Sequence, residues 1–578
     1  MPFPSGAGRR RRGLERRTSA GNASIEPDCA GIVRFRPATT SAPSGFGYGA
    51  VVTRGWVTCA VLAAALGSVG AYAQPPEEGL PSEDGQPWYE RGGGTDAPDD
   101  GAGDTPSPEE EEPALAVPTP PAGETAPESS PSETSAPSAA AEGTSNRSGF
   151  FFGSYGRISA VSNLRGGLGR ESDIVAFNPR IDEDLYFELE LRREDELVGN
   201  LRSRIVATVA FTGEFFHLDS EFDENIAVRN LFAEVQNALV DDLSLWVGSR
   251  MWRGDDVYLL NFWPLDNLNT VGGGIDYRAL DERLDLRLAV GLARPDDPFH
   301  RQVDGTVANS GFLPADVVVL DRPRTTVAAK ATYFLFGRRV ERGAKISLYA
   351  EGHFLPEGRR NIEFGITEAL PRDGGYVLGG QLGGWDVGNR AFVNLFFKWG
   401  RGLGAYNPLG VPFRVGGVMD SQRAREALVA LSANWETGPF GLQVGAYYRN
   451  FRDADPNVFD RNHMAEGAVN LRPHVWVGDH AGLSMDLSYQ ALQMSALDEV
   501  TGKVVRGGVT KIGFIPFYSP FGRGTYTRPH LRIIYAATIR DDGAQRLYPF
   551  EDPRSRQSVE HFLGVGAEWW FDSTSYGF

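Results

Sequence analysis

Apolar and polar side chains alternate without a break in Leu185-Tyr186-Phe187-Glu188-Leu189-Glu190-Leu191-Arg192. Successive side chains of a β-strand point to opposite faces, so the leucines and Phe187 share one face, and the charged residues share the other with Tyr186. A water-soluble sandwich seldom sets so many charges opposite so continuous an apolar face. The pattern is typical of a strand that has lipid on one side and an aqueous lumen on the other.

Three further segments repeat this alternation at roughly the nine to eleven residues of a tilted strand that crosses a hydrocarbon layer. They are residues 283–292, 483–490 and 563–571, and the last of them ends on the aromatic Phe571. We therefore expect an all-β fold, a closed transmembrane antiparallel β-barrel of about eighteen strands. Short clusters at 437–439 and 478–480 predict tight turns at its periplasmic end.

The composition agrees with a strand-rich chain. Of its 578 residues, 70 are glycine and 11% are aromatic, whereas two are cysteine. A mean hydropathy of −0.29 excludes a bundle of membrane helices but not a barrel, whose strands present only alternate residues to lipid. The net charge is −18 at pH 7, and the basic cluster of Arg9–Arg12 lies in the expected leader. This distribution disfavours a nucleic-acid partner.

Four regions are expected along the chain. Residues 1–50 are interpreted as a non-native leader or an over-long gene start. Residues 51–73 are interpreted as a signal peptide, because an apolar run precedes the cleavage motif Ala71-Tyr72-Ala73. Residues 74–148 are rich in Pro, Ala, Glu and Ser and carry a net charge of −15, which predicts a disordered acidic tether in the periplasm. Residues 149–578 are expected to form the barrel.

The inward faces of the first two strands carry side chains that suit sugars. Tyr155 and Arg157, and then Tyr186 and Glu188, each place an aromatic ring and a charge two positions apart. Aromatic faces stack on the apolar C–H side of a pyranose ring, while arginine and carboxylate groups hydrogen-bond its hydroxyls. The alternative for any single residue is that it only fills and stiffens the barrel wall.

At this point the chain resembles the maltoporin family, which are eighteen-stranded trimeric outer-membrane porins for maltodextrins and related sugars. The resemblance covers about residues 150–571. It is carried by Tyr155-Gly156-Arg157, Leu185–Leu189, Leu245–Arg250, Gly254–Tyr258, Asn261–Trp263, Thr527–Arg532 and Gly566–Phe571.

The resemblance implies a role for individual residues. It places an aromatic slide for sugars at Tyr155, Tyr186 and Trp570, and the aromatic of the constriction at Trp263, in a loop from about Gly254 to Gly273. The polar track and the constriction are placed at Arg157, Arg180, Glu188, Arg229, Arg250 and Asp256. An aromatic that reaches in from a neighbouring subunit falls on Phe216 or Phe222.

The chain also departs from the family pattern. Gly254 stands where the family has an arginine, Tyr258 where it has a histidine, and Asn261 where it has an aspartate. Two further slide aromatics of the family fall near Gly467 and Asn389.

We therefore expect facilitated diffusion of carbohydrates through the outer membrane of a Gram-negative bacterium, without enzymatic activity, cofactor or metal. The implied partners are an oligosaccharide, outer-membrane lipid, further copies of the chain in a homotrimer, and the barrel-assembly machinery. One alternative is a general or anion-selective diffusion porin, which requires Lys or Arg rings in its constriction. Another is an outer-membrane anchor whose tether binds a periplasmic partner. An enzyme is disfavoured because no G-x-S-x-G motif is present.

Overall fold

The computed structural model describes residues 148–574 apart from gaps at 166, 168, 170–171, 182–184, 213–224, 296, 298, 301, 308–314, 320–321, 364–365, 407–409, 413–419, 456–462 and 498–501. The expected leader, signal peptide and tether, up to residue 147, lie outside the described residues. So do Phe216 and Phe222, the two candidates for an aromatic from a neighbouring subunit.

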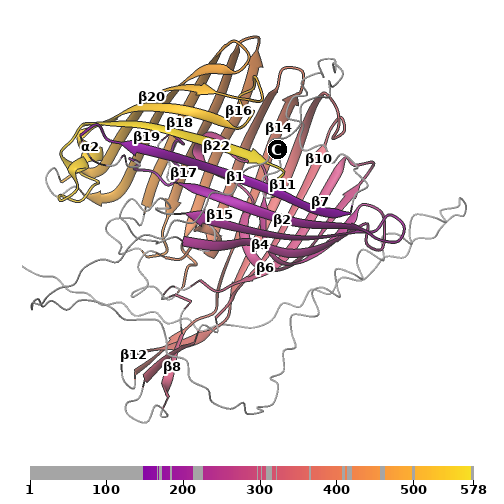
Figure 1. Ribbon diagram of the computed structural model, residues 1–578. Helices are drawn as coiled ribbons and strands as arrows, with labels where there is room; N and C mark the ends of the chain where they lie inside the picture. The colour runs from indigo at the N-terminus through magenta and orange to yellow at the C-terminus, as the bar shows by residue number, and fades with distance from the viewer. Residues whose placement is uncertain are drawn as a thin grey trace, which may run out of the picture. The chain divides into compact units, whose positions relative to one another are not determined.

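Eighteen strands form one antiparallel sheet that closes on itself (Figure 1), which confirms the predicted barrel and its strand number. The strands are β1 (Gly149–Ser162), β2 (Tyr186–Glu196), β3 (Arg202–Thr212), β4 (Asn225–Gln236), β5 (Leu243–Arg253), β6 (Asn267–Ala279), β7 (Leu284–Ala293), β10 (Arg324–Phe334), β11 (Arg342–Leu355), β14 (Asp373–Asp386), β15 (Ala391–Gly402), β16 (Arg425–Thr437), β17 (Phe440–Arg452), β18 (His463–Val477), β19 (Ala481–Leu497), β20 (Val504–Tyr518), β21 (His530–Arg540) and β22 (Val559–Phe571). Several exceed the expected nine to eleven residues, up to the 17 residues of β19, because they continue past the hydrocarbon layer into the loops.

Two hairpins and four short helices complete the described secondary structure. The hairpins are β8 (Gln302–Val307) with β9 (Ala315–Val319), and β12 (Gly358–Glu363) with β13 (Ile366–Leu370). The helices are η2 (Tyr258–Leu260), η3 (Leu403–Ala405), α2 (Asp542–Gln545) and η4 (Pro553–Ser555). Within the described part of the chain, no helix combines the length and the hydrophobicity that a bilayer crossing requires.

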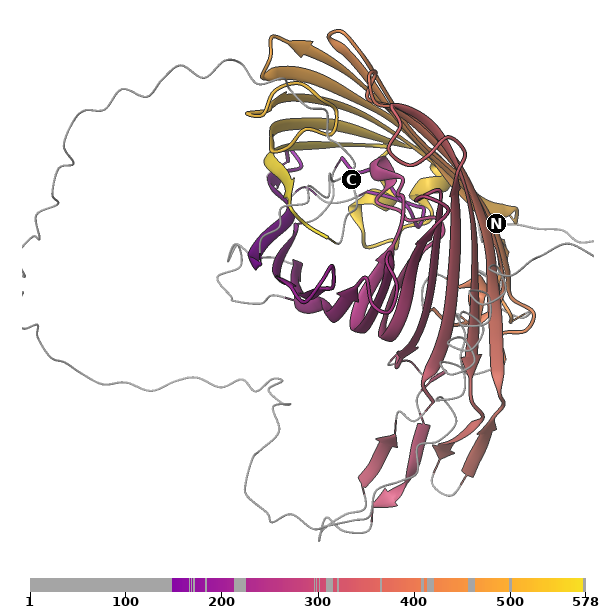
Figure 2. The same ribbon diagram turned by 90° about the vertical axis from the view of Figure 1, so that its right-hand side faces the viewer.

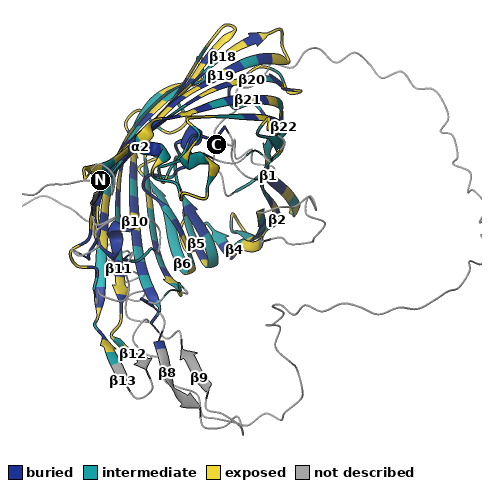
Figure 3. Ribbon diagram, turned by 90° about the vertical axis from the view of Figure 1, so that its left-hand side faces the viewer, coloured by how far each residue is buried: buried dark blue, intermediate teal, exposed yellow. Residues whose placement is uncertain are grey.

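The two faces of the sheet differ as the alternation predicts. In β19, the apolar Met485, Leu487 and Tyr489 are exposed on the outside, while Asp486 and Gln490 are buried on the inside. Figure 3 shows the same alternation of buried and exposed positions along many strands. An apolar outer band with a polar inner face is what a barrel needs when lipid surrounds it and water enters its lumen.

The barrel closes where β1 pairs with β22, in a register that sets Ser154 opposite Phe571. Trp569 Nε1 donates a hydrogen bond of 3.0 Å to Ser154 Oγ across this seam. The Phe152 and Phe571 rings lie 5.8 Å apart. The last strand therefore ends at Phe571, as predicted. Apolar side chains on its outer face cover the contact between β1 and β22.

Tight turns and long loops occupy opposite ends of the barrel. Thr437 pairs with Phe440 across a two-residue turn, where Gly438 takes a φ of +54°. Val477 pairs with Ala481 across a three-residue turn, so both predicted turns are confirmed. The other end carries the long connections, including 163–185 and 254–266. The predicted loop 254–273 is wrong at its C-terminal end, because Asn267 already pairs with Arg253 in the β5–β6 ladder.

The outward face makes a testable prediction at Val565, in the middle of β22 and 58% exposed. Val565→Arg should lower the free energy of unfolding by about 2–4 kcal/mol, because a guanidinium is placed against hydrocarbon. The control is Val198→Arg in the turn between β2 and β3, where the side chain is 94% exposed. Denaturant unfolding from lipid vesicles measures both variants, and equal losses would contradict the assignment of Val565 to the lipid face.

Candidate substrate path through the barrel

The loop between β5 and β6, residues 254–266, folds into the lumen and is called the inner loop here. Its tip begins in η2 and turns back at Asn261, whose φ of 47° lies in the left-handed region. Leu259 packs against Gly445 of β17, where a Cβ would lie 3.0 Å from Leu259 Cβ. A larger residue at 445 would therefore push the inner loop away from the wall. The interior of the barrel, where chain segments lie inside the strands, is visible in Figure 2.

Salt bridges hold the inner loop against the neighbouring wall of β10 and β11. Lys345 Nζ of β11 lies 2.7 Å from Asp255 Oδ2, and Lys330 Nζ of β10 lies 2.7 Å from Asp266 Oδ2. Burial opposes ionisation of Asp255, but Lys345 and Lys330 hold the pKa of its carboxyl well below the usual value. Both ends of the loop are therefore fixed by charge pairs.

A second segment inside the barrel, residues 172–181, was not predicted and is called the first-loop segment. Phe177 stacks on Phe262 of the inner loop with 3.7 Å between ring centroids. Asp173 Oδ1 lies 2.8 Å from Lys511 Nζ of β20. The Arg180 backbone N–H donates to the Leu259 carbonyl at 2.9 Å. The first-loop segment and the inner loop therefore narrow the lumen together.

A third segment, the inner turn of residues 519–529, reaches in from the end of the tight turns. Arg528 is buried, and its Nε donates to Glu568 Oε2 at 2.9 Å. The inner turn also brings Tyr526 to 5.3 Å from the ring of Tyr258 in the inner loop.

Glu568 of β22 joins all three segments. It is 2% exposed and accepts a hydrogen bond of 2.7 Å from the Tyr258 hydroxyl. It forms salt bridges with Arg180 at 3.4 Å, with Arg528 at 2.9 Å and with Arg532 of β21. Sequence reasoning gave Glu568 no role, although the alternation of β22 places this charge on the inward face of the closing strand.

The cationic surroundings of this network change the acidity of Tyr258. Burial opposes the loss of its proton, but Arg528, Arg532, Arg180 and Arg472 together lower the pKa of the phenol to about 7. The centre of the barrel is therefore electropositive.

The predicted residues of β1 and β2 gather in one cluster. Tyr155 and Tyr186 have ring centroids 5.9 Å apart, and Tyr186 donates a hydrogen bond to Glu188. Arg157 donates to the Tyr155 hydroxyl at 3.2 Å. Arg180 donates to the same hydroxyl. Tyr155 is 4% exposed, so most of its ring is covered.

The predicted residues of β4 and the constriction face this cluster. Arg229 Nε lies 3.8 Å from Glu188 Oε1. Arg253 lies over the Trp263 ring, 3.9 Å from its centroid. Both arginines interact electrostatically with Tyr186, so the Arg253–Trp263 pair lies within electrostatic reach of the Tyr186 cluster.

Arg250 lies in a separate group within the wall. It is 3.3 Å from Asp276 and 3.9 Å from Glu234. It also lies over the rings of Phe232 and Trp246. The structure does not bring Arg250 together with the Tyr186 cluster.

Aromatic rings continue beyond the predicted residues. Trp570 lies 5.9 Å from Tyr258 and 6.4 Å from Tyr526, and Tyr526 lies 5.8 Å from Phe392 of β15. Sequence reasoning missed Tyr258, Tyr526 and Phe392 as members of this series. A signal existed for Phe392, which lies three positions from Asn389, where a family aromatic was expected.

Asp256 precedes η2 in the inner loop and is the one predicted acidic residue there. Burial raises its pKa to about 6, assisted by the neighbouring Asp255 and opposed by Arg180 and Arg253. Its carboxyl is therefore neutral below about pH 6 and charged above it.

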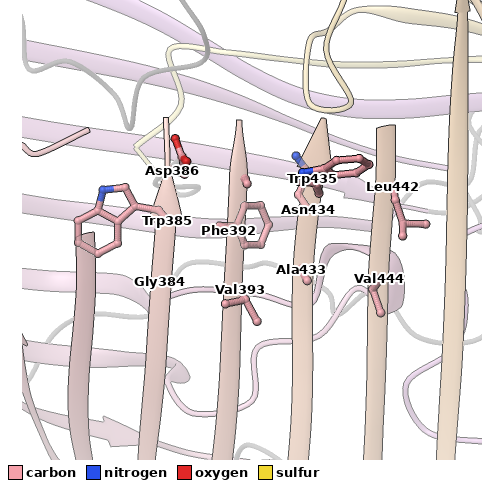
Figure 4. A pocket seen from close by; sticks show the side chains of 11 residues that line it. Gly384, Trp385, Asp386, Phe392, Val393, Ala433, Asn434, Trp435, Leu442 and Val444 are labelled. Atoms are coloured by element: carbon pink, nitrogen blue, oxygen red, sulfur yellow. The ribbon is translucent and has the colours of Figure 1, made fainter. Parts of the chain in front are cut away.

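A groove on the outside of β14–β17 does not belong to this path. Small residues, Gly384 and Ala433, form its floor between Val393, Trp435 and Leu442, as Figure 4 shows. Val393 and Trp435 are exposed on the apolar outer face, so this groove faces lipid rather than the lumen.

An apolar outer band, a charged lumen and inward-folded segments that narrow it together define the chain as a porin, a β-barrel membrane channel. The model of the family described as LamB porin matches residues 147–571. The chain therefore belongs to the LamB porin family, which confirms the expected maltoporin-like relationship. The family and the barrel support an outer-membrane location and a channel rather than an enzyme.

Three solved structures are similar to this chain. They are OccD3 (OpdP) of Pseudomonas aeruginosa (10% identity, 73% of this chain and 91% of that chain, TM-score 0.36), an anion-selective porin from Comamonas acidovorans (12%, 74% and 100%, 0.35), and OpdK of Pseudomonas aeruginosa with vanillate (12%, 73% and 98%, 0.34). A comparison with curated protein sequences finds no match.

Glu568→Gln should loosen all three inward segments, because it leaves buried arginines without their carboxylate. We expect the free energy of unfolding to fall by about 3–5 kcal/mol and the single-channel conductance to rise. The control Glu282→Gln removes an exposed partner of Arg339 and should cost about 1 kcal/mol or less. Denaturant unfolding and bilayer recordings measure these effects, and a tight, unaltered channel in Glu568→Gln would contradict the role of this carboxylate.

Acidification should raise the anion selectivity of the channel. As the pH falls through about 6, Asp256 gains a proton and the constriction loses one negative charge. The chloride-to-potassium permeability ratio, taken from reversal potentials in a KCl gradient between pH 8 and pH 5, should rise. Asp256→Asn should lose the part of the rise near pH 6 and keep the part near pH 7 that belongs to Tyr258, and an unchanged rise near pH 6 in this variant would assign the titration to another group.

Proposed function

We propose that this porin mediates facilitated diffusion of carbohydrates across the outer membrane. The observation that carries the proposal is the aromatic series, which runs from Tyr186 and Tyr155 through Trp570 and Tyr526 to Phe392 beside charged groups. Aromatic faces favour the C–H faces of pyranose rings, and the neighbouring charged groups hydrogen-bond the hydroxyls. This arrangement suits a solute with both kinds of surface.

In this mechanism no covalent bond is made or broken. A sugar enters from the end with long loops, which we assign to the cell exterior, and passes between Trp263 and Tyr186. Hydroxyl groups exchange water for Arg157 and Arg229 while the ring passes from one aromatic to the next. The sugar leaves past Phe392 into the periplasm, down its concentration gradient.

The remaining assignments belong to the same proposal. A signal peptide at residues 51–73 directs export, residues 74–148 form a periplasmic tether, and the barrel-assembly machinery inserts the barrel into outer-membrane lipid. Membership of the LamB porin family supports assembly into a homotrimer. The slide and track roles of Tyr155, Tyr186, Trp263, Trp570, Arg157, Arg180, Glu188, Arg229, Arg250 and Asp256 are part of the proposal.

Sugar block of single-channel current in planar bilayers tests the function. We expect saturable block by a four-residue oligosaccharide, and Trp570→Ala should raise the half-blocking concentration about tenfold, because a stacking contact is worth about 1 kcal/mol or more. Trp435→Ala, which removes an outward Trp that is 49% exposed, should leave the block unchanged. A conductance that no neutral or charged sugar blocks would overturn the function and indicate a general diffusion pore.

A further inference from the structure

An arginine lies over each of five aromatic rings in the described lumen. Arg253 lies 3.9 Å from the centroid of Trp263, and Arg528 lies 4.2 Å from that of Trp570. Arg157 lies 5.5 Å from the Tyr186 ring. The other two are Tyr258 and Tyr155, with Arg180 at 4.6 Å and 6.0 Å. A guanidinium group therefore lies near each ring, and that of Arg180 approaches Tyr155 at its hydroxyl.

This arrangement offers more than a neutral sugar requires. A pyranose that stacks on an aromatic ring needs an uncovered apolar face. A guanidinium over the ring takes one face and offers fixed N–H donors, which suit the paired oxygens of a carboxylate or sulfate group. Each pair of ring and arginine therefore presents stacking surface and anion recognition side by side.

The charges around the narrow lumen favour the same conclusion. Arginines outnumber carboxylates in the linked clusters around Tyr186 and Tyr258. The six arginines are Arg157, Arg180, Arg229, Arg253, Arg528 and Arg532, and the three carboxylates are those of Glu188, Asp256 and Glu568. Other charges nearby are paired one to one, as in Lys345 with Asp255 and Arg472 with Asp486.

Three arginines of this cluster, Arg157, Arg229 and Arg253, are partly exposed. Arg229 is 25% exposed at its side chain, whereas its partner Glu188 is 1% exposed. Glu568 is buried together with Arg180 and Arg528. The Arg253 Nε donates to the neutral Asn267 side chain at 2.8 Å. A solute in the constriction therefore meets three guanidinium groups and the partly exposed Asp256.

We infer that the preferred substrates are anionic oligosaccharides, whose sugars carry carboxylate or sulfate groups. This inference rests on the proposed carbohydrate function and names the substrate class. The sugar ring stacks on Trp263 or Tyr186, and its acidic group binds the adjacent Arg253 or Arg157. The lowered pKa of Tyr258 is consistent with the same positive potential.

Two other solutes fit these observations less well. A neutral oligosaccharide offers Arg157 and Arg253 only hydroxyl oxygens, which offset the loss of their water less well than an ionised group does. A small inorganic anion needs the arginines but makes no use of the aromatic series. An acidic oligosaccharide uses both.

The test measures the block of single-channel current by four probes at low KCl concentration. They are tetragalacturonate, a sulfated carrageenan tetrasaccharide, maltotetraose and inorganic phosphate. We expect tetragalacturonate or the sulfated probe to block at a concentration about tenfold below that of maltotetraose, because hydrogen bonds between ionised groups exceed neutral ones by about 1.4 kcal/mol. The difference should shrink as KCl is raised. The acidic probe that blocks at the lower concentration identifies whether carboxylate or sulfate is the preferred acidic group.

Variants separate charge from stacking. Arg253→Gln and Arg157→Gln should each raise the half-blocking concentration of the acidic probe about tenfold and that of maltotetraose by a smaller factor, because a guanidinium binds an ionised oxygen more strongly than a hydroxyl. Arg339→Gln, at a 73% exposed side chain in the turn between β10 and β11, is the matched control and should change neither. An unchanged circular dichroism spectrum shows that each variant is folded.

The outcomes are distinct. Block by maltotetraose that equals or exceeds block by both acidic probes would overturn the anionic substrate class and leave the carbohydrate function intact. Phosphate that blocks as well as the acidic tetrasaccharides would overturn the class in favour of a simple anion site. Absence of block by every sugar would overturn the carbohydrate function itself, and the inference with it.

Discussion

The whole structure depends on one constraint, which is that no backbone hydrogen-bonding group can remain unpaired in hydrocarbon. The ladder between β1 and β22 satisfies it by closing the sheet. Closure also fixes which side chains of each strand face lipid and which face the lumen. A strand shifted by one residue would exchange these two sets of side chains. Glu188, Glu190 and Glu568 can therefore be buried in a membrane protein, since their strands turn them inward toward arginine partners.

The same constraint explains why the barrel was predictable from sequence. The alternation in Leu185–Arg192 and in β22 indicates directly which face of each strand meets lipid. No information about residues far away in the sequence is needed to interpret it. Tight turns were predictable for a similar local reason, since Gly438 and Gly478 take positive φ angles that other residues seldom adopt.

The inward segments were harder to predict because their signals are not local. The position of Phe177 is set by ring contacts with Phe262 of the inner loop and with Tyr447 of β17. Tyr526 lies beside Tyr258 because the inner turn folds into the lumen. The length of this turn in the sequence does not indicate that it folds inward. Arg180 was placed on the polar track by family resemblance alone, and its burial between Tyr155 and Glu568 depends on residues separated by up to 388 positions. Such contacts follow from the closed barrel rather than from any pattern in the segments themselves.

The departures from the family pattern have a common physical explanation. At position 254 a side chain would displace the buried pair of Lys330 and Asp266, and the neighbouring Arg253 supplies the guanidinium over Trp263. Tyr258 donates its hydroxyl to Glu568, and Asn261 takes the left-handed backbone conformation that ends η2. These positions anchor the inner loop within an arginine-rich network. The loop, fixed in this way, binds arginines of the wall and of the other inward segments through Tyr258 and Trp263, so the positive potential of the constriction is built into the fold before any solute arrives.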